Sequence, residues 1–155
     1  MQTGDTVVVD VGAEYSGYSA DVTRTFPVSG KFSARQREIY QIVLDAQKAA
    51  VAKIKPGVRI REIHQAAYDV IKSKGYEKYF IHGTSHPIGL EVHDVGDANR
   101  PLEAGMVITV EPGIYIPDEQ LGVRIEDDYL VTSNGSRWLS SLPREIAEVE
   151  ALMRR

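Results

Sequence analysis

Two aspartates, Asp10 and Asp21, flank a turn-forming stretch near the start of the chain. Residues that face each other across an antiparallel hairpin lie equally far from its turn and point to the same side of the sheet. A turn centred between Tyr15 and Ser16 would therefore set these two carboxylates side by side. Asp10 also lies in the valine-rich segment 7–11, where burial is expected. Opposed or buried carboxylates are unfavourable unless a positive group offsets them.

Two glutamates repeat this arrangement further along the chain. Glu111 ends the apolar segment 107–111, and it lies as far from a turn between Asp118 and Glu119 as Glu126 does. A single acid near a strand end is more often a turn former or a solvated charge, but two opposed pairs are harder to assign to chance. Four carboxylates carry four negative charges, which two divalent cations would balance. The pattern therefore favours a two-metal site that a neutral imidazole completes.

Three of the four histidines occur close together in the segment 81–94, which also contains glycines. His82, His86 and His93 lie there, and glycines beside them allow the backbone to approach a ligand or metal closely. One such histidine alone would more often be structural, whereas three together favour a site. His64 lies among charged residues of a predicted helix, and we interpret it as a surface side chain.

Composition limits the classes of protein and of metal ligand. The chain has 155 residues, and we expect one domain over residues 1–155. A net charge of -4 argues against a nucleic-acid partner, and no apolar run approaches the ~20 residues of a membrane span. Because there is no cysteine, metal ligands must be histidines and carboxylates, which suit manganese, iron, cobalt or zinc. Residues 1–5 do not resemble a signal peptide, which predicts a cytoplasmic protein.

Apolar periodicity predicts an α+β domain with antiparallel sheet. Segment 79–95 is expected to be strand and loop. Ser33 and Gln36 have the spacing of a capping box, and Pro56 and Gly57 end the helix that begins there. We expect strands over 6–12, 18–28, 106–111 and 122–131, a long turn over 112–121, and helices over 33–54, 60–74 and 143–153.

Four segments around the acids and histidines follow a recognisable pattern. They are DVGAEYSGYSADVTRTFP at 10–27, HGTSHPIGLEVHD at 82–94, VEPGIY at 110–115 and VRIEDD at 123–128. Together they resemble the creatinase/aminopeptidase P/prolidase family (metallopeptidase family M24), in the order in which that family has them, and most closely its bacterial Xaa-Pro aminopeptidase branch. The resemblance implies the pita-bread fold and two divalent metal ions, usually manganese, with cobalt, zinc or iron as alternatives. It also implies a peptide substrate with proline at the second position, cleaved before that proline.

The same resemblance implies a role for each candidate ligand. Asp10 would chelate one metal ion, and Asp21 would bridge both ions. His86 and Glu111 would bind the other ion, and Glu126 would be the second bridge. Glu126, or its partner Glu111, would also accept a proton from the water that the two ions share.

Further residues would act around the ions. His93 would not be a ligand but would be catalytic, because it would stabilise charge on the carbonyl oxygen of the scissile bond. His82 would lie beside the ions or in the substrate pocket. Arg124 is two residues from Glu126, so it points to the same face of the strand and could orient that carboxylate. Tyr115 could join the same network.

In that family the catalytic domain extends further upstream than the nine residues that precede Asp10 here. We therefore expect the carboxy-terminal part of the pita-bread fold, with an uncovered apolar surface and a sheet edge that a second copy could complete in a homo-oligomer. Proline-specific catalysis could be weak, because other substrate contacts lie upstream in the family. The alternatives are an Xaa-Pro dipeptidase, a metal-binding chain with little or no peptidase activity, and a non-catalytic binding module. The five intact ligands weigh against the last.

Overall fold

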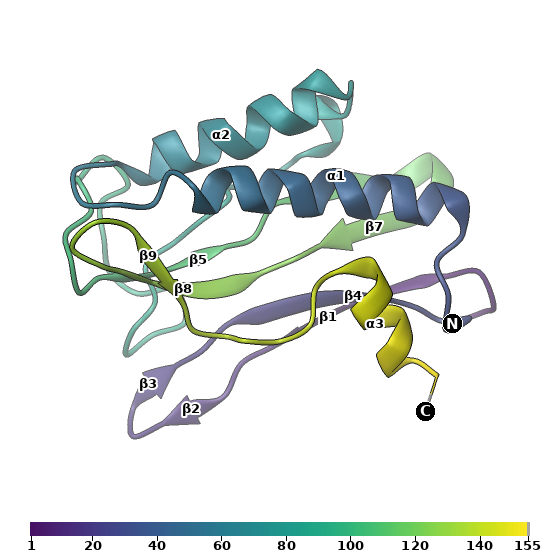
Figure 1. The fold of residues 1–155 in the computed structure, drawn as a ribbon, viewed down its shortest axis with the longest axis horizontal. Coiled ribbons are helices and arrows are strands. Elements are labelled where there is room, and N and C mark those ends of the chain that lie inside the picture. The colour runs from purple at the N-terminus through teal and green to yellow at the C-terminus, as the bar shows by residue number, and fades with distance from the viewer. Residues whose placement is uncertain (155) are drawn as a thin grey trace.

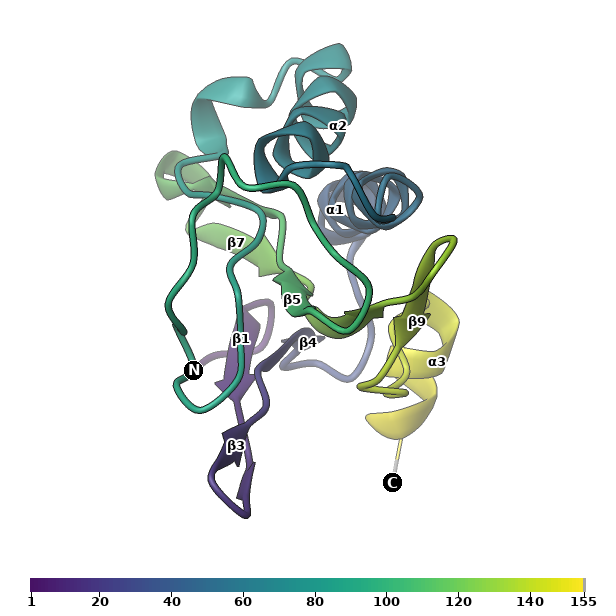
Figure 2. The same ribbon diagram turned by 90° about the vertical axis from the view of Figure 1, so that its left-hand side faces the viewer.

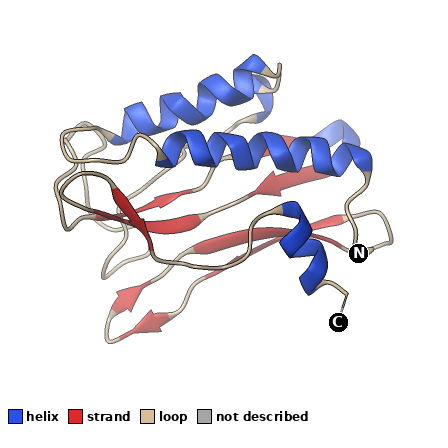
Figure 3. Ribbon diagram, viewed as in Figure 1, coloured by secondary structure: helices blue, strands red, loops and turns tan. Residues whose placement is uncertain are grey.

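Two long helices lie over antiparallel strands in the structure, a computed structural model that describes residues 1–154 (Figure 1, Figure 2). This mixture of helices and antiparallel strands confirms the predicted α+β class (Figure 3). The helices are α1 (Ala34–Val51), α2 (Ile60–Ser73) and α3 (Ile146–Leu152), with short 3-10 helices η1 (Glu77–Tyr79) and η2 (Pro117–Glu119). The strands are β1 (Thr6–Val11), β2 (Glu14–Tyr15), β3 (Tyr18–Ser19), β4 (Val22–Pro27), β5 (Val107–Val110), β6 (Gly113–Ile116), β7 (Leu121–Arg124), β8 (Asp127–Val131) and β9 (Ser136–Trp138).

β1 pairs with β4, and the small hairpin of β2 and β3 extends this first ribbon. The predicted register is wrong, because Asp10 lies opposite Thr23 rather than opposite Asp21. The turn is centred one residue later, between Ser16 and Gly17, since these two adopt the positive φ angles (54° and 82°) that a two-residue hairpin turn requires. Asp21 still shares a face with Asp10, because it lies two residues from Thr23. The predicted returning strand is also divided in two, into β3 and β4.

β5 pairs with β8, and β6 pairs with β7, in one continuous register. Val110 lies opposite Asp127, which places Glu111 and Glu126 at facing positions just beyond that ladder and confirms the predicted register. The predicted long turn over 112–121 is wrong, because β6 and β7 form a ladder there and only η2 makes the turn. β9 pairs with β8 and was not predicted from the sequence.

α1 begins with the predicted capping box: the Ser33 side chain accepts the Gln36 N–H, and the Gln36 side chain accepts the Ser33 N–H. α1 packs on α2 and on β5, β6 and β7. Burial of each large apolar side chain there stabilises the fold by about 2 kcal/mol. None of the helices within residues 1–154 is long and apolar enough to cross a membrane. Side chains at the centre of the core include Ile39, Leu44, Ile63, Ile71, Ile108 and Ile125.

α3 is shorter than the predicted helix over 143–153. Glu145 is its N-cap, and the Glu148 side chain accepts the Glu145 N–H, so the helix begins only at Ile146. The residues before Glu145 instead run along the first ribbon, where the carbonyl of Pro143 accepts a hydrogen bond from Arg24 of β4.

Candidate metal centre

Five side chains that could bind metal ions meet at one cavity. Asp10, Asp21, His86, Glu111 and Glu126 all line a hollow of about 400 Å³. Donor atoms of His86, Glu111 and Glu126 lie within 4.8 Å of one another, and so do those of Asp10, Asp21 and Glu126. The structure therefore brings together all five residues that the sequence indicated. The two groups share Glu126, as two neighbouring ions with a common ligand would require.

Each of the four acids lies where a strand ladder starts or stops. Asp10 is near the end of β1, and Asp21 directly precedes β4. Glu111 directly follows β5, and Glu126 lies in the link between β7 and β8. His86 lies in the loop beside β5, to which its carbonyl is hydrogen-bonded. Segments far apart in the sequence thus direct their side chains into one space.

His86 faces two carboxylates with a nitrogen that has no proton to donate. Its Nδ1 lies 3.0 Å from the carbonyl oxygen of Pro87, which can only accept, so Nδ1 carries the ring proton. Its Nε2 lies 3.5 Å from Glu111 Oε1 and 3.6 Å from Asp21 Oδ2. Burial lowers the pKa of His86, which favours the neutral ring. The free electron pair of Nε2 therefore faces two carboxyl groups, an arrangement that suits a cation between them.

The carboxylates are crowded and poorly hydrated. Burial raises the pKa of Glu126 to about 8, of Glu111 to about 7 and of Asp21 to about 6, and neighbouring carboxylates add to each rise. Glu126 is 1% exposed, and its Oε1 has no hydrogen-bond partner within residues 1–154. Divalent ions would satisfy these oxygens and offset their repulsion. The donor set of carboxylates and one imidazole therefore fits the metal ions that the sequence predicts.

Thr23 and Arg124 hold two of the acids. The Thr23 hydroxyl donates to Glu126 Oε2 at 2.7 Å and accepts from Arg124 Nε at 3.2 Å. Arg124 Nη2 donates to Asp10 Oδ2. Arg124 thus contacts Asp10 directly and reaches Glu126 through Thr23, whereas the sequence suggested that it orients Glu126 itself.

Tyr115 and His82 continue this network along the cavity wall. Arg124 Nη1 donates to the Tyr115 hydroxyl at 2.9 Å, which leaves the Tyr115 proton for His82 Nε2, also at 2.9 Å. His82 Nδ1 in turn donates to the carbonyl of Gly83 at 2.7 Å. Gly113 leaves room for these contacts, because a Cβ there would lie 2.6 Å from the Tyr115 hydroxyl. His82 is therefore fixed in one orientation beside the candidate ligands.

His93 lies at the exposed mouth of the cavity. Its ring stacks on that of His86, with ring centroids 3.9 Å apart and planes 15° from parallel. One of its nitrogens lies within 4.8 Å of donor atoms of Asp21 and His86. The ring can therefore reach a molecule bound over the acids.

His64 is not the surface side chain that the sequence suggested. It is half-buried, its Nδ1 lies 2.9 Å from Thr84 Oγ1, and its ring centroid is 5.2 Å from that of Phe80. Burial lowers its pKa. The prediction failed because the loop after α2 folds back over this face of the helix, which the helical pattern alone does not reveal.

Thr23 and Arg24 were missed by the sequence reasoning. Thr23 had a signal, because it lies two residues after Asp21 and so points to the same face of the strand. Arg24 had none, because its side chain is buried against Asp127, more than a hundred residues away. A single arginine in an alternating strand would ordinarily be taken as exposed.

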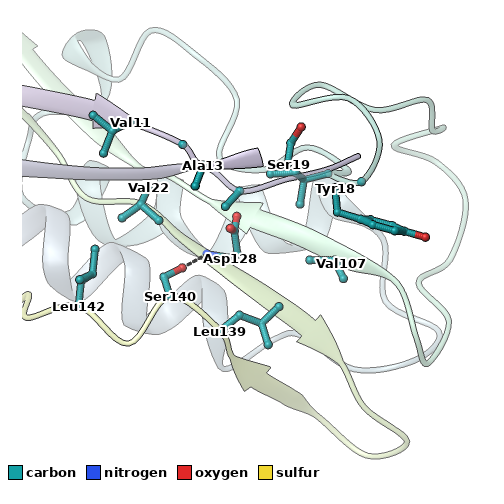
Figure 4. A pocket seen from close by; sticks show the side chains of 14 residues that line it. Val11, Ala13, Tyr18, Ser19, Val22, Val107, Asp128, Leu139, Ser140 and Leu142 are labelled. Carbon is teal, nitrogen blue, oxygen red and sulfur yellow. Dashed lines mark hydrogen bonds between the residues drawn. The ribbon is translucent and has the colours of Figure 1, made fainter. Parts of the chain in front are cut away.

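A larger hollow of about 670 Å³ adjoins the acid cluster and is mainly apolar (Figure 4). Val11, Val22 and Leu139 line it, together with Asp128. Asp128 Oδ2 accepts the backbone N–H of Asp21 at 3.1 Å, and burial raises the pKa of Asp128 to about 6. Asp128 therefore supports the backbone of a candidate ligand by this hydrogen bond.

Comparison with protein families gives a match over most of the chain. The model of metallopeptidase family M24 matches residues 1–133. The chain is 43% identical to an Xaa-Pro aminopeptidase of Haemophilus influenzae over 99% of its own length, and 48% identical to an Xaa-Pro dipeptidase of Pyrococcus furiosus over 94%. It covers 43% and 42% of those two relatives, so it spans less than half of their length.

Two solved structures are similar to this chain in both fold and sequence. An aminopeptidase, PepP, of Pseudomonas aeruginosa has a TM-score of 0.93 and 40% identity, with 99% of this chain and 42% of that one covered. The prolidase of Pyrococcus horikoshii has a TM-score of 0.88 and 47% identity, with 94% and 43% covered. The arrangement of helices and strands described above is therefore shared with both.

Proposed function

This chain belongs to metallopeptidase family M24 and has part of the pita-bread fold, and on that premise we propose that it holds a dinuclear metal centre for peptide hydrolysis. The bond cleaved would be the one between an amino-terminal residue and proline. Its relatives named as Xaa-Pro aminopeptidase and Xaa-Pro dipeptidase support that substrate class.

The observation that carries the proposal is the convergence of five metal-binding side chains on one cavity, in two groups of donor atoms that share Glu126. Asp10 would chelate one ion, and His86 and Glu111 would bind the other. Glu126 would bridge, since it belongs to both groups of donor atoms. Asp21 would be the second bridge, because it lies within reach of both Asp10 and His86.

Two divalent ions held by these residues would lower the pKa of a shared water and polarise the peptide carbonyl. Glu126 or Glu111 would take the proton of the attacking water, because their carboxylates face the same space as the other donors. His93 would donate to the carbonyl oxygen as negative charge develops on it. Its stacking on His86 would hold it at that position.

A chain that binds metal but hydrolyses peptides weakly is the second candidate. It requires only the five donors that line the cavity, all of which lie within the described residues. Manganese is the metal we propose for either function. The chain has similar sequence identity to an Xaa-Pro aminopeptidase and to an Xaa-Pro dipeptidase. Whether it prefers dipeptides or longer peptides is therefore a question for experiment.

Peptide hydrolysis with added Mn²⁺ tests the proposal. We expect release of the first residue from an Xaa-Pro tripeptide to exceed release from the matched Xaa-Ala tripeptide, and an Xaa-Pro dipeptide measures the dipeptidase alternative. Glu111→Gln should lower the rate by about 100-fold or more, because it removes both a ligand and a proton acceptor. Glu91→Gln is the matched control, since Glu91 is exposed in the loop beside His93 and does not line the cavity.

Full activity after chelation, or after Glu111→Gln, would contradict the proposed function. Metal binding without measurable hydrolysis would favour the second candidate.

A further inference from the structure

Two consecutive residues of β4 hold Glu126 in place. Glu126 lies outside both neighbouring ladders, β5 with β8 and β6 with β7. Its N–H donates to the carbonyl of Thr23 at 3.0 Å, and its Oε2 accepts from the Thr23 hydroxyl at 2.7 Å. Its own carbonyl accepts from Arg24 Nη1 at 2.6 Å. The position of this residue therefore depends on β4 rather than on its own strands.

Arg24 reaches Glu126 from the side opposite the cavity. Successive side chains of a strand point to opposite faces, so the Thr23 side chain faces the acids and that of Arg24 lies behind them. Arg24 is only 4% exposed. A buried guanidinium is costly unless its N–H groups are paired, so such a residue must be extensively hydrogen-bonded.

All three nitrogens of the Arg24 guanidinium are in fact bonded. Besides Glu126, Nη1 contacts the carbonyl of Thr23 at 2.8 Å. Nη2 donates to Asp127 Oδ1 at 2.6 Å and to the carbonyl of Leu142 at 3.0 Å. Nε donates to the carbonyl of Pro143 at 2.8 Å. One guanidinium thus bonds both the backbone carbonyl of Glu126 and the side chain of the next residue, Asp127.

We propose that Arg24 is a positioning residue for the metal centre, which fixes the backbone of Glu126 and thereby keeps its carboxylate among the other ligands. This inference rests on the proposed function, in which Glu126 is shared by both ions. The need for such a device follows from charge: Glu126 faces Glu111 and Asp21, whose carboxylates repel it before an ion binds. The Thr23 hydroxyl supplies only one bond to that carboxylate.

Lysine cannot replace Arg24 in this role. An ammonium has three donors at a single point, whereas the planar guanidinium has five donors in a fixed fork. The charge of Asp127 would attract the ammonium and draw it from the Glu126 carbonyl. Arg24→Lys therefore keeps the buried charge but loses the contact that positions Glu126.

Arg144 offers a matched control. It also donates to Asp127, through Nη1 to Oδ2 at 3.1 Å, and to the Tyr129 hydroxyl at 2.6 Å. Within residues 1–154 it makes no hydrogen bond to Glu126, whose backbone carbonyl is bonded by Arg24. Arg144→Lys therefore disturbs the same ion-pair network without touching the Glu126 carbonyl.

Metal binding to the two variants tests the inference. Metal-free protein is titrated with Mn²⁺ by calorimetry and with Co²⁺ by visible absorption, and far-ultraviolet circular dichroism and thermal unfolding verify the fold. We expect Arg24→Lys to weaken Mn²⁺ binding by about 10-fold or more and to change the Co²⁺ bands, as loss of a residue that orients a ligand does. Arg144→Lys should stay within about 2-fold of the unchanged chain, with the same Co²⁺ bands, even if it melts at a lower temperature.

Equal affinity and equal Co²⁺ bands in Arg24→Lys and the unchanged chain would overturn the inference. So would an equal loss in both variants, which would indicate general destabilisation. If the unchanged chain binds neither metal, the proposed function fails, and this inference fails with it. If the unchanged chain binds metal but Arg24→Lys binds it equally well, only this inference fails. If Arg24→Lys does not fold, Arg24→Gln replaces it. The same loss of about 10-fold is expected, because the glutamine amide has two N–H donors where the guanidinium has five.

Discussion

At the scale of single residues, the candidate site is defined by crowded, buried carboxyl groups beside one imidazole. Glu111, Glu126 and Asp21 are held close together, and His86 adds a nitrogen lone pair rather than a proton. This arrangement lowers the stability of the metal-free fold, because buried like charges repel and lose their hydration. Their cost to folding should therefore disappear when cations bind.

The stability of the metal-free chain should fall as pH rises. Raised pKa values, about 8 for Glu126, about 7 for Glu111 and about 6 for Asp21, mean that the folded chain binds these protons more tightly than the unfolded chain. The stabilisation from these protons is present at about pH 4 and is lost as pH rises through about 8. Burial lowers the pKa of His64 and His86, and this opposes the loss only below their ordinary pKa of 6.5. We therefore expect the melting temperature in EDTA to decrease between about pH 7 and about pH 8, and Mn²⁺ to restore it at the upper end.

Two variants separate this effect from other titrations. Glu126→Gln should flatten the decrease, because its amide does not ionise, whereas Glu91→Gln should follow the unchanged chain. The same pH dependence of the melting temperature in Glu126→Gln and in the unchanged metal-free protein would contradict the explanation.

At the scale of elements, the candidate ligands lie where the strand ladders are interrupted. β1 and β4 stop pairing where β2 and β3 begin, and Asp21 lies in that gap. Gly12 makes the gap possible, because a Cβ there would lie 1.9 Å from the carbonyl oxygen of Ala20, the residue before Asp21. No side chain can be accommodated at this point unless the backbone of the ligand segment moves.

Gly12→Ala should therefore damage both the fold and the site. We expect a loss of about 1–3 kcal/mol in the free energy of unfolding, as for other overpacked positions, together with weaker Mn²⁺ binding. Chemical denaturation and calorimetry measure the two effects. Gly135→Ala is the control, since a Cβ there has no neighbour closer than 4.0 Å within the described chain. Equal stability and affinity in Gly12→Ala and Gly135→Ala would show that the close approach has no consequence.

The same elements show what the sequence could and could not predict. The register of Glu111 and Glu126 was correct, because Pro117 leaves one place for the turn. The predicted turn of the first hairpin was one residue too early, because Ser16 adopts a positive φ that few residues other than glycine favour. Asp10 and Asp21 still lie close together, because both point to the same face of the ribbon in the observed register as well as in the predicted one.

Buried polar contacts between distant segments lay beyond the reach of sequence patterns. The side chain of Arg24 is buried only because Asp127 and the Glu126 carbonyl come from another ribbon. His64 is half-buried because Thr84 and Phe80 lie against it. Local periodicity contains no information on such partners, whereas it does place apolar residues on the correct face of each helix.

At the scale of the whole molecule, the two faces of the fold differ. α1 and α2 lie over one side of the strands (Figure 2). Apolar side chains of β1 are exposed. Val11 is 58% exposed, and Val7, Val9 and Phe26 line an apolar hollow of about 400 Å³. Within residues 1–154, β1 has β4 as its one paired strand. Apolar side chains of β1 are therefore exposed within the described residues, and pairing with a second copy stays a prediction.

Self-association of the 155-residue chain should follow from that surface. We expect light scattering after size-exclusion chromatography to give a mass above that of one chain, rising with concentration. Val11→Lys should shift the distribution to monomer, because a charge there opposes burial, whereas Thr3→Lys at an exposed polar position should not. A single-chain mass at every concentration would contradict this prediction.

Metal content is the most direct measure of the central claim that the five donors hold two ions. Metal-free protein is equilibrated with Mn²⁺, desalted and assayed by elemental analysis, beside His86→Ala and the control His64→Gln. We expect about two ions per chain in the unchanged protein and in His64→Gln, and about one in His86→Ala, which removes a ligand of one ion only. Absence of bound metal in the unchanged chain, or the same content in His86→Ala, would contradict the account.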